Sequence, residues 1–523
     1  MDDLAQAHAG ATATGPDTER FRLAAYLADL RARFPEEIET IDAPTRLIDI
    51  AARLDGNPRA VLLRSAGPEA VPLVGNVCAS RARLAAAFGV APAELRAEIT
   101  RRLALPPCVI DIDSAKAPVH QVILTGADAD LTALPVHLQH AFDGAPYISA
   151  GVDYAADSVR GITNTGFRRL MLRGRTEAGV DLISPSDLRA IYMESAARGA
   201  PLPVSFVIGC HPIDQVAAMM RLPVDEMGLV SSLRAAPLAV VAGVTNGVRV
   251  PADAELVLEG FLDPRGHVEP EGPYGEFLGY YGAIKHNPVF HLTAITRRRD
   301  AVFQTSTISG RTLSRTDTAQ LNAIRTEIMV WRALETAVRE PVGVYVTPAS
   351  GGSLNVRISL RQRVPGEARN AIAAAFGCLA NVKNVFVVDP DVDILSDEQM
   401  DWALATRFQA DRDLMIQPGM RAMPIDPSLA GARLGCKTGF DLTMPVLPPG
   451  ALEAITPLPP TTDGKRFASV EAALRDGPKF FVELVAAMAS DDGREIVREI
   501  DALRAAPGIT RDSSGRYVLG DAA

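Results

Sequence analysis

One long segment without helix-breaking residues divides this sequence into two parts. Residues 318–338, TAQLNAIRTEIMVWRALETAV, contain no glycine or proline and carry apolar residues at helical spacing. A helix of this length would extend about 30 Å, roughly the width of a small domain. We therefore expect it to link two folded parts of the chain.

The segments on both sides of this helix alternate between strand-like and helix-like patterns. Before it, FRLAAYLADLRARF has helical periodicity, and SFVIGC, LAVVAG and FHLTAITRR are apolar runs of strand length. After it, VGVYVTP, LNVRISLR and VKNVFVVD alternate with the helical pattern GEARNAIAAAFGCL. The pattern predicts a mixed α/β (α+β) fold, with a large domain at residues 21–317 and a smaller α/β domain at residues 339–445.

The two ends of the chain are expected to be less regular. Residues 1–20 are rich in small and acidic residues and lack the basic and apolar regions of a signal peptide, so we expect a disordered tail. Residues 446–523 begin with a proline-rich linker and continue into a predicted C-terminal helix around VEAALRDGPKFFVELVAAMA. Because tethered terminal helices often dock on a neighbouring subunit, we expect a homo-oligomer.

Charge and cysteine usage narrow the class of partner. The formal net charge is -10, which disfavours nucleic acid and anionic membranes because no basic face would meet their phosphates. No uninterrupted apolar run approaches the ~20 residues that a membrane span requires. The five cysteines contain no C-x-x-C pair, which is typical of reduced thiols in a cytoplasmic protein. A small molecule is the favoured partner.

The segment EGPYGEF has the highest density of candidate catalytic groups. It places Glu271 and Glu276 around a Gly-Pro-x-Gly turn. Two carboxylates held by one turn can face the same site, where one serves as an acid while the other stays ionised. The alternative is a solvated acidic loop.

The segment NTGFRR could supply a positive charge to such a site. It contains Asn164 and, five residues later, Arg169. An arginine can hold a substrate carboxylate through paired hydrogen bonds, which a lysine cannot do. Taken alone, the motif also fits a surface arginine.

The segment ISPSDLRAIY predicts a helix N-terminus. Ser184 is the expected N-cap, Pro185 the first helical residue, and Asp187 lies three residues after the cap, as in a capping box. A helix N-terminus also binds phosphate, and an aspartate there could reach a metal ion that bridges the phosphate. Capping and metal binding are compatible.

Two further charged residues are weaker candidates when taken singly. Glu226 precedes an apolar segment and fits a structural role. Lys383 enters an apolar strand, where its charge needs a partner such as a cofactor phosphate. Neither G-x-G-x-x-G after a strand nor G-x-x-x-x-G-K-[ST] occurs, so nucleotide-binding loops have no support.

Together and in this order, these segments resemble the UbiD-like family of decarboxylases. The resemblance runs from about residue 22 to residue 450 and rests on the combination of NTGFRR, PVDEMG, VLEG, EGPYGEFLGY, VKNVFVVD and WALATR. It implies a flavin-binding domain with a split β-barrel, a linking helix, and a second α/β domain that mediates oligomerisation as a dimer or hexamer. It further implies prenylated FMN as cofactor, supplied by a flavin prenyltransferase, with Mn²⁺ (or Mg²⁺) and possibly K⁺.

The resemblance also assigns roles to individual residues. Arg169 resembles the substrate-facing arginine, Glu271 the carboxylate that fixes it, and Glu276 the catalytic acid/base. Lys383 resembles the lysine of the second domain that reaches the flavin phosphate. The metal ligands implied are Asn164, Asp187 and Glu226. The cofactor-binding residues implied are Asn164, Thr165, Phe167, Arg169, Ser186, Asp187, Arg221, Glu226 and Lys383.

One departure from the family pattern affects the metal. Where most characterised members have a Gln-His pair, this chain has Ser186 and Asp187. We infer that Asp187 replaces the histidine ligand, giving an all-oxygen site that suits Mg²⁺ or Mn²⁺. The competing interpretation is that Asp187 only caps the helix and that the metal is weakly held or absent.

The implied activity is reversible, non-oxidative decarboxylation of an aromatic, heteroaromatic or α,β-unsaturated acid through a covalent prenylated-flavin adduct. Glu276 would protonate the carbon that loses CO2, which favours an apolar surrounding. Arg311, Arg315 or Asp317 could meet a polar substituent of the substrate. The alternatives are a flavin-binding, non-catalytic subunit of a multi-subunit carboxylase and a metal-dependent carboxylate hydrolase without flavin.

Overall fold

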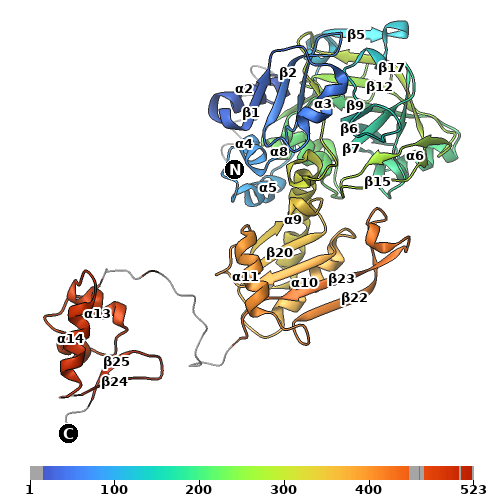
Figure 1. Cartoon of the computed structure of the whole chain (residues 1–523). Helices are drawn as coiled ribbons and strands as arrows, with labels where there is room; N and C mark the ends of the chain where they lie inside the picture. Colours follow the sequence, from blue (N-terminus) through green and yellow to red (C-terminus); the bar gives the residue numbers. More distant parts are fainter. Residues whose placement is uncertain (1–15, 447–458, 460–463, 506–507, 521–523) are drawn as a thin grey trace. The chain divides into compact units, whose positions relative to one another are not determined.

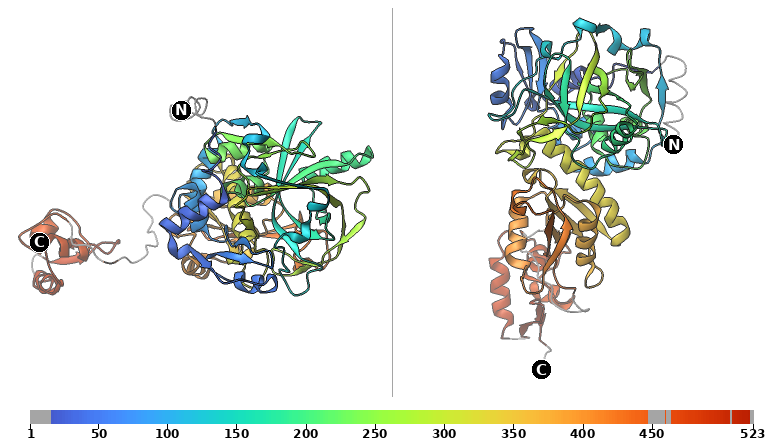
Figure 2. Two further views of the ribbon diagram at one scale, coloured as in Figure 1. Left: turned by 90° about the horizontal axis from the view of Figure 1, so that it is seen from above. Right: turned by 90° about the vertical axis from the view of Figure 1, so that its right-hand side faces the viewer.

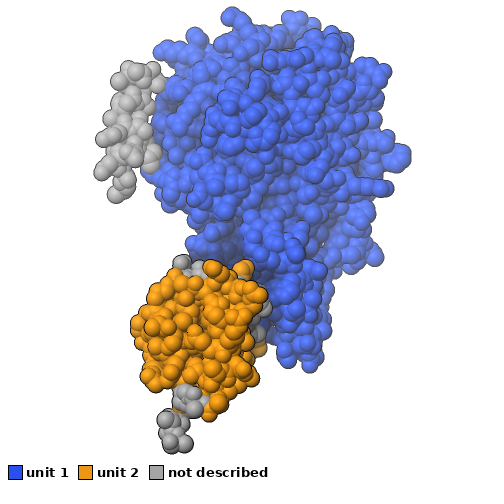
Figure 3. Space-filling view, turned by 60° about the vertical axis from the view of Figure 1, so that its left-hand side comes forward, with its two compact units in different colours: residues 1–444 blue, residues 445–523 orange. Residues whose placement is uncertain are grey.

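The chain folds into two compact units, residues 1–444 and residues 445–523 (Figure 3). The computed structural model describes residues 16–446, 459, 464–505 and 508–520. Most of the expected N-terminal tail and most of the proline-rich linker therefore lie outside the described residues.

The centre of the first unit is a closed six-stranded antiparallel barrel (Figure 1). The strands pair in the order β12-β9-β6-β7-β8-β17, and β17 pairs back to β12, so every barrel strand has two neighbours. This confirms the barrel that the resemblance implied. Its strands are β6 (Tyr147–Asp157), β7 (Ile162–Leu172), β8 (Glu177–Val180), β9 (Leu202–Ile208), β12 (Leu256–Leu262) and β17 (Val289–Arg297), with β5 (Val122–Thr125) added beside β17.

Two smaller sheets and a group of helices complete the larger part of this unit. One sheet has the order β1-β2-β3-β18 and the other the order β11-β10-β4. The apolar faces of most of the helices pack with these sheets into one large core, whereas α3 and α6 pack in a second core with strands of the barrel. The strands are β1 (Ile38–Ile41), β2 (Ala60–Ala66), β3 (Val71–Gly75), β18 (Phe303–Gln304), β4 (Val109–Asp111), β10 (Leu238–Ala242) and β11 (Arg249–Pro251). The helices are α2 (Leu23–Arg33), α3 (Leu47–Leu54), α4 (Arg81–Phe88), α5 (Leu95–Leu103), α6 (Asp187–Ala197), α7 (Pro212–Met219) and α8 (Glu226–Arg234).

Helix α9 (Asp317–Ala337) belongs to two hydrophobic cores at once. Its residues Leu321 and Ile324 pack in the core beside the barrel, whereas Val330 and Leu334 pack in the core of the second α/β part. The expected linking helix is thus present, within one residue of its predicted ends.

The second α/β part is a five-stranded mixed sheet in the order β19-β20-β21-β23-β22. The central pairs β20–β21 and β21–β23 are parallel, and the outer pairs are antiparallel. In the right-hand view of Figure 2 the long helix α9 runs beside this sheet, and it contacts β19 and α10. The elements are β19 (Pro341–Val346), β20 (Asn355–Leu360), α10 (Glu367–Cys378), β21 (Asn384–Val388), α11 (Asp397–Arg407), β22 (Leu414–Arg421) and β23 (Leu434–Asp441).

The C-terminal unit differs from the single expected helix. The predicted helix is broken at Gly477, whose φ of 144° no helix allows, and at Pro478, which ends a helix before it. The unit contains α12 (Val470–Arg475), α13 (Phe481–Met488), α14 (Arg494–Leu503) and a hairpin of β24 (Ile509–Arg511) and β25 (Tyr517–Leu519). These elements share a hydrophobic core of their own.

No helix among the described residues is long and apolar enough to span a membrane.

A buried ion triad fixes α7 and α8 in the first unit. Arg234, at the end of α8, lies 2.6 Å from a carboxylate oxygen of Asp253 and also binds Asp214 in a two-point contact. All three residues are buried. Removing only the cation would leave two carboxylates buried without a counterion. This destabilises a protein far more than replacing all the charged partners with apolar residues.

We therefore expect Arg234→Met to lower the free energy of unfolding by about 3–5 kcal/mol. Arg64→Met is the matched control, because the Arg64–Asp42 pair is exposed and should contribute no more than about 1 kcal/mol. Urea unfolding followed by circular dichroism measures both. Equal losses in the two variants would show that the triad is not a stability determinant.

Candidate active site

Strand β7 carries most of the residues singled out in the sequence. Asn164, Thr165, Phe167 and Arg169 lie along it beside β6, and β8 pairs with the end of the strand at residues 170–172. Arg169 lies five residues beyond Asn164 on the strand, and the two side chains contact different groups. Two clusters result, one around Arg169 and one around Asn164.

The Arg169 cluster brings three carboxylates onto one guanidinium. Its Nε lies 3.2 Å from Glu271, its Nη1 3.2 Å from Glu276 and its Nη2 2.9 Å from Asp181. Burial alone would lower the pKa of Arg169, but the three carboxylates raise it well above its usual value. The ring of Tyr274 packs under the guanidinium at 4.5 Å. The structure thus brings Arg169, Glu271 and Glu276 together.

Four short strands hold the two glutamates in place. Glu271 ends β13 (Glu269–Glu271), which pairs with β16 (Lys285–Asn287), and Glu276 follows β14 (Tyr274–Gly275), which pairs with β15 (Tyr281–Gly282). The backbone between the glutamates turns at Gly272, where φ is 99°. Both glutamates are at least nine-tenths buried.

The environment of Glu276 is charged rather than apolar, contrary to expectation. Lys285 on β16 lies 3.0 Å from Glu276 and 3.3 Å from Asp181. Burial alone would raise the pKa of Asp181, but Arg169 and Lys285 together lower it, so this carboxylate stays ionised. Three carboxylates and two cations therefore meet here, an excess of one negative charge.

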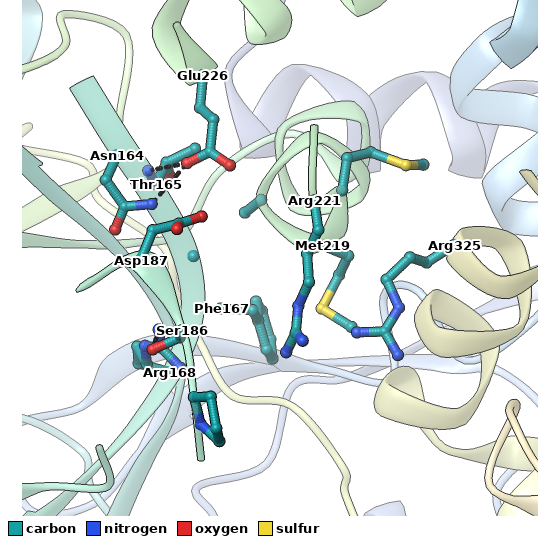
Figure 4. A pocket seen from close by; sticks show the side chains of 14 residues that line it. Asn164, Thr165, Phe167, Arg168, Ser186, Asp187, Met219, Arg221, Glu226 and Arg325 are labelled. Atoms are coloured by element: carbon teal, nitrogen blue, oxygen red, sulfur yellow. Dashed lines mark hydrogen bonds between the residues drawn. The ribbon is translucent and has the colours of Figure 1, made fainter. Parts of the chain in front are cut away.

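The Asn164 cluster lines a cavity of about 410 Å³ (Figure 4). Asn164, Asp187 and Glu226 lie on one side of it, and Arg221 and Arg325 lie on the other. The lining residues are Asn164, Thr165, Gly166, Phe167, Arg168, Pro185, Ser186, Asp187, Ala218, Met219, Met220, Arg221, Glu226 and Arg325. Seven of the nine cofactor-binding residues predicted from the sequence are among them. The other two are Arg169 and Lys383.

The chemistry of this cavity suits a hard divalent cation. Glu226 accepts hydrogen bonds from Asn164 Nδ2 at 2.7 Å and from the Thr165 backbone at 2.6 Å. Asn164 Oδ1 is buried and accepts no hydrogen bond. Burial chiefly raises the pKa of Glu226 to about 8, with Asp153 and Asp187 adding to the effect. A cation would satisfy the amide oxygen and stabilise the ionised carboxylate, so an oxygen-ligated metal fits these residues.

Asp187 does not cap the helix as the sequence suggested. Helix α6 begins at Asp187 and not near Ser184, and its N-cap is Ser186, whose Oγ accepts a hydrogen bond from the Arg189 backbone. Both serines have the residue type of an N-cap, and the chain uses the later one. The Asp187 side chain is 56% exposed and 3.8 Å from Arg160, which leaves it available to a ligand. Among the described residues, three grouped His, Cys, Asp or Glu are not found, so any metal site here depends on the amide oxygen of Asn164.

Lys383 is not brought to this cavity. It directly precedes β21 and lines a separate cavity of about 170 Å³. There its Nζ lies 2.6 Å from both Asp426 and Ser428. The counterion of Lys383 in this structure is therefore Asp426, where the sequence had suggested a cofactor phosphate.

Two of the residues considered for substrate contact have structural partners. Asp317 is fully buried and accepts hydrogen bonds from the Cys78 and Thr307 backbones, so it anchors the start of α9 and cannot meet a substrate. Arg315 is exposed and donates to the Gly56 carbonyl. Of the three, only Arg311 is left without such a contact among the residues that the structure describes.

Asp181, Lys285 and Arg325 were missed by the sequence analysis. Each is a single charged residue in an ordinary segment, without a motif. Lys285 is the cross-strand partner of Glu271, a signal that appears only once the β13–β16 pairing is known.

Comparison with known proteins gives the family. The 3-octaprenyl-4-hydroxybenzoate carboxy-lyase Rift-related domain matches residues 111–312, and the C-terminal domain of the same carboxy-lyase matches residues 319–442. The anhydromevalonate phosphate decarboxylase of Aeropyrum pernix is 32% identical over 378 residues, covering 72% of this chain and 82% of the relative.

Solved structures of UbiD-class enzymes share the fold. HmfF from Pelotomaculum thermopropionicum in complex with FMN has a TM-score of 0.76 at 33% identity, covering 83% of this chain and 97% of HmfF. An evolved dimeric form of HmfF in complex with prFMN has a TM-score of 0.74 at 31% identity, covering 83% and 96%. The 3,4-dihydroxybenzoic acid decarboxylase AroY of Klebsiella pneumoniae has a TM-score of 0.74 at 26% identity, covering 84% and 98%. With a matching fold and both family domains in order, this chain belongs to the UbiD family of carboxy-lyases.

Proposed function

We propose that the chain catalyses the reversible, non-oxidative decarboxylation of an aromatic, heteroaromatic or α,β-unsaturated acid with prenylated FMN as cofactor. The observation that carries the proposal is the buried Arg169 held between Glu271 and Glu276. A protein without catalysis has no physical need to bury these three charges together, because each costs free energy to desolvate.

The cavity beside β7 is the site that we assign to the cofactor phosphate and its metal ion. Asn164, Asp187 and Glu226 would hold Mn²⁺ or Mg²⁺, since all three offer oxygen ligands. When bound, the flavin supplies an acceptor for the electron pair that remains on carbon as CO2 leaves. Its supply by a flavin prenyltransferase, and assembly of the chain into a homo-oligomer, are part of the same proposal.

Arg169 would orient the substrate acid. Its Nη2 is shared among Asp181, Glu271 and Glu276, so an incoming carboxylate must replace one of them. Separating Asp181 from Arg169 should cost the least free energy, because Lys285 remains beside Asp181 as a counterion. We infer that the substrate carboxylate takes the place of Asp181 on Arg169, with Glu271 holding the guanidinium in position.

Glu276 would carry the proton to the reacting carbon. It is the carboxylate opposite Glu271 on the same guanidinium, and it lies 3.0 Å from Lys285. A carboxyl group at this position would give a proton to the carbon that loses CO2 and take up another for the next turnover.

The substrate class rests on the relatives. AroY is named for an aromatic acid and the Aeropyrum pernix relative for an anhydromevalonate phosphate, and the chain is similar to both. Since the Asp317 carboxylate is buried at the start of α9, substituents of the substrate would contact other residues of the pocket.

Glu276→Gln should abolish decarboxylation without loss of the flavin. Removing a general acid typically lowers the rate by a factor of about 10²–10⁴. The measurement is CO2 release from a panel that includes 3,4-dihydroxybenzoic acid, a heteroaromatic acid and anhydromevalonate phosphate, with protein co-expressed with a flavin prenyltransferase. Glu269→Gln is the control, because Glu269 lies seven residues before Glu276, on β13, but pairs with Arg173 in a partly exposed position.

The same assay separates the alternatives. A non-catalytic subunit would bind flavin and release no CO2 from any acid in the unmodified chain. A metal-dependent hydrolase would act with metal alone and retain no chromophore. Undiminished turnover by Glu276→Gln would overturn the role given to this residue.

Lys285→Met should raise KM for the acid by about tenfold or more. The Lys285 ammonium lies 3.3 Å from Asp181 and would remain its counterion when the substrate carboxylate takes the place of Asp181 on Arg169, so without it Asp181 should stay on the guanidinium and compete with the substrate. Lys285→Arg, which retains the positive charge, should leave KM nearly unchanged. Equal KM values in all three proteins would exclude this release of Asp181.

Asp187→Ala should weaken Mn²⁺ binding by at least about tenfold, as expected for loss of an ion-site residue. Because Ser186 and not Asp187 caps α6, stability should change little. Ser186→Ala should show the reverse, a loss of about 1 kcal/mol in stability with Mn²⁺ affinity retained. Calorimetric titration and thermal unfolding distinguish the two, and unchanged Mn²⁺ affinity in Asp187→Ala would reject the ligand role.

A further inference from the structure

Arg325 is a buried arginine with no partner in the protein. It projects from α9, is 6% exposed, and lines the 410 Å³ cavity. Its Nε is buried without a hydrogen-bond acceptor, and it forms no ion pair with any residue that the structure describes. A buried unpaired charge is expensive, so this position demands an explanation.

The other buried arginines of the described chain show what is missing. Arg83 pairs with Glu37 at 2.7 Å, Arg234 with Asp214 and Asp253, and Arg298 with Glu19 at 2.8 Å. In each case a carboxylate of the protein balances the guanidinium. Arg325 instead has Arg221 as its charged neighbour, and burial together with that neighbour lowers its pKa to about 9. It therefore remains charged at neutral pH.

Arg221 also lacks a partner among the described residues, although it is exposed. Within the described part of the chain its guanidinium has no hydrogen bond and no ion pair. Figure 4 shows Arg221 and Arg325 on the side of the cavity away from Glu226 and Asn164. Two guanidinium groups without counterions thus line one cavity.

We propose that Arg325 and Arg221 form a binding subsite for a phosphate monoester. A phosphate dianion matches the two positive charges and has enough oxygens to bind both guanidiniums while another oxygen meets a cation held by Asn164, Asp187 and Glu226. A monocarboxylate would balance only one arginine. Arg168 also lines the cavity, but its charge is already paired with Asp153.

In this subsite Arg325 would make the phosphate contact that the resemblance assigned to Lys383. That lysine is held by Asp426 in a different cavity, whereas Arg325 reaches the cavity from the linking helix. The inference rests on the proposed function only in taking FMN as the first candidate ligand. The phosphate could also belong to a phosphorylated substrate, and the experiment separates the two sources.

The test is Arg325→Met, with Arg332→Met as the matched control because Arg332 lies exposed on the same helix α9. FMN and riboflavin, which lacks the phosphate, are titrated into the flavin-free proteins by fluorescence. If the flavin supplies the phosphate, Arg325→Met weakens FMN binding by about 10- to 100-fold and leaves riboflavin binding unchanged. Arg332→Met behaves as the unmodified chain.

A second arm uses inorganic phosphate and anhydromevalonate phosphate with thermal unfolding as readout. If these ligands raise Tm for the unmodified chain but not for Arg325→Met, while FMN binds both equally, the subsite serves a phosphorylated substrate. Because this arm needs neither flavin nor turnover, it remains informative even where the proposed decarboxylation fails.

Two results would overturn the proposal. One is equal affinity of Arg325→Met and the unmodified chain for FMN and for both phosphate ligands. The other is a ligand-free Arg325→Met that unfolds at a markedly lower temperature than the unmodified chain, since loss of an unpaired buried charge should leave Tm equal or higher. Such a drop would mean that the arginine has a structural partner.

Discussion

The hydrogen bonding of β7 on both edges is the constraint on which both halves of the site depend. In the closed barrel β7 cannot slip against β6 without moving β8 as well, so its side chains have fixed register. That register sends Arg169 toward the glutamates and Asn164 toward the cavity. A single strand thus positions both the residues assigned to the substrate and those assigned to the cofactor.

The distribution of charge separates the two clusters. Around Arg169 the cations and anions are nearly balanced within the protein, which allows this cluster to be assembled before any ligand arrives. In the neighbouring cavity, Asn164 Oδ1 and Arg325 Nε lack partners. Unsatisfied buried groups are costly, and a ligand in this cavity would satisfy both.

How far the sequence predicts this molecule depends on how local each feature is. The EGPYGEF turn carries both glutamates within a few residues, and the helix at 318–338 needs no distant partner, so both were predictable. Asp181 and Lys285 meet Glu276 only through strand pairing, and Arg325 reaches the cavity only through the packing of α9, so no local pattern reveals them. The predicted N-cap of α6, Ser184, is wrong because Ser186 has the same capping propensity and lies two residues later. Only the tertiary structure decides which of the two serines caps the helix.

The separate core of the C-terminal unit has an evolutionary consequence. The family domains end at residue 442, and the core formed around Leu484 and Ile496 contains no residue from before that point. Substitutions in this core therefore need no compensating change in the barrel or the second α/β part. The sequence of the C-terminal unit can therefore diverge within the limits of its own packing, or the unit can be exchanged among relatives. The carboxy-lyase part is constrained in addition by its chemistry.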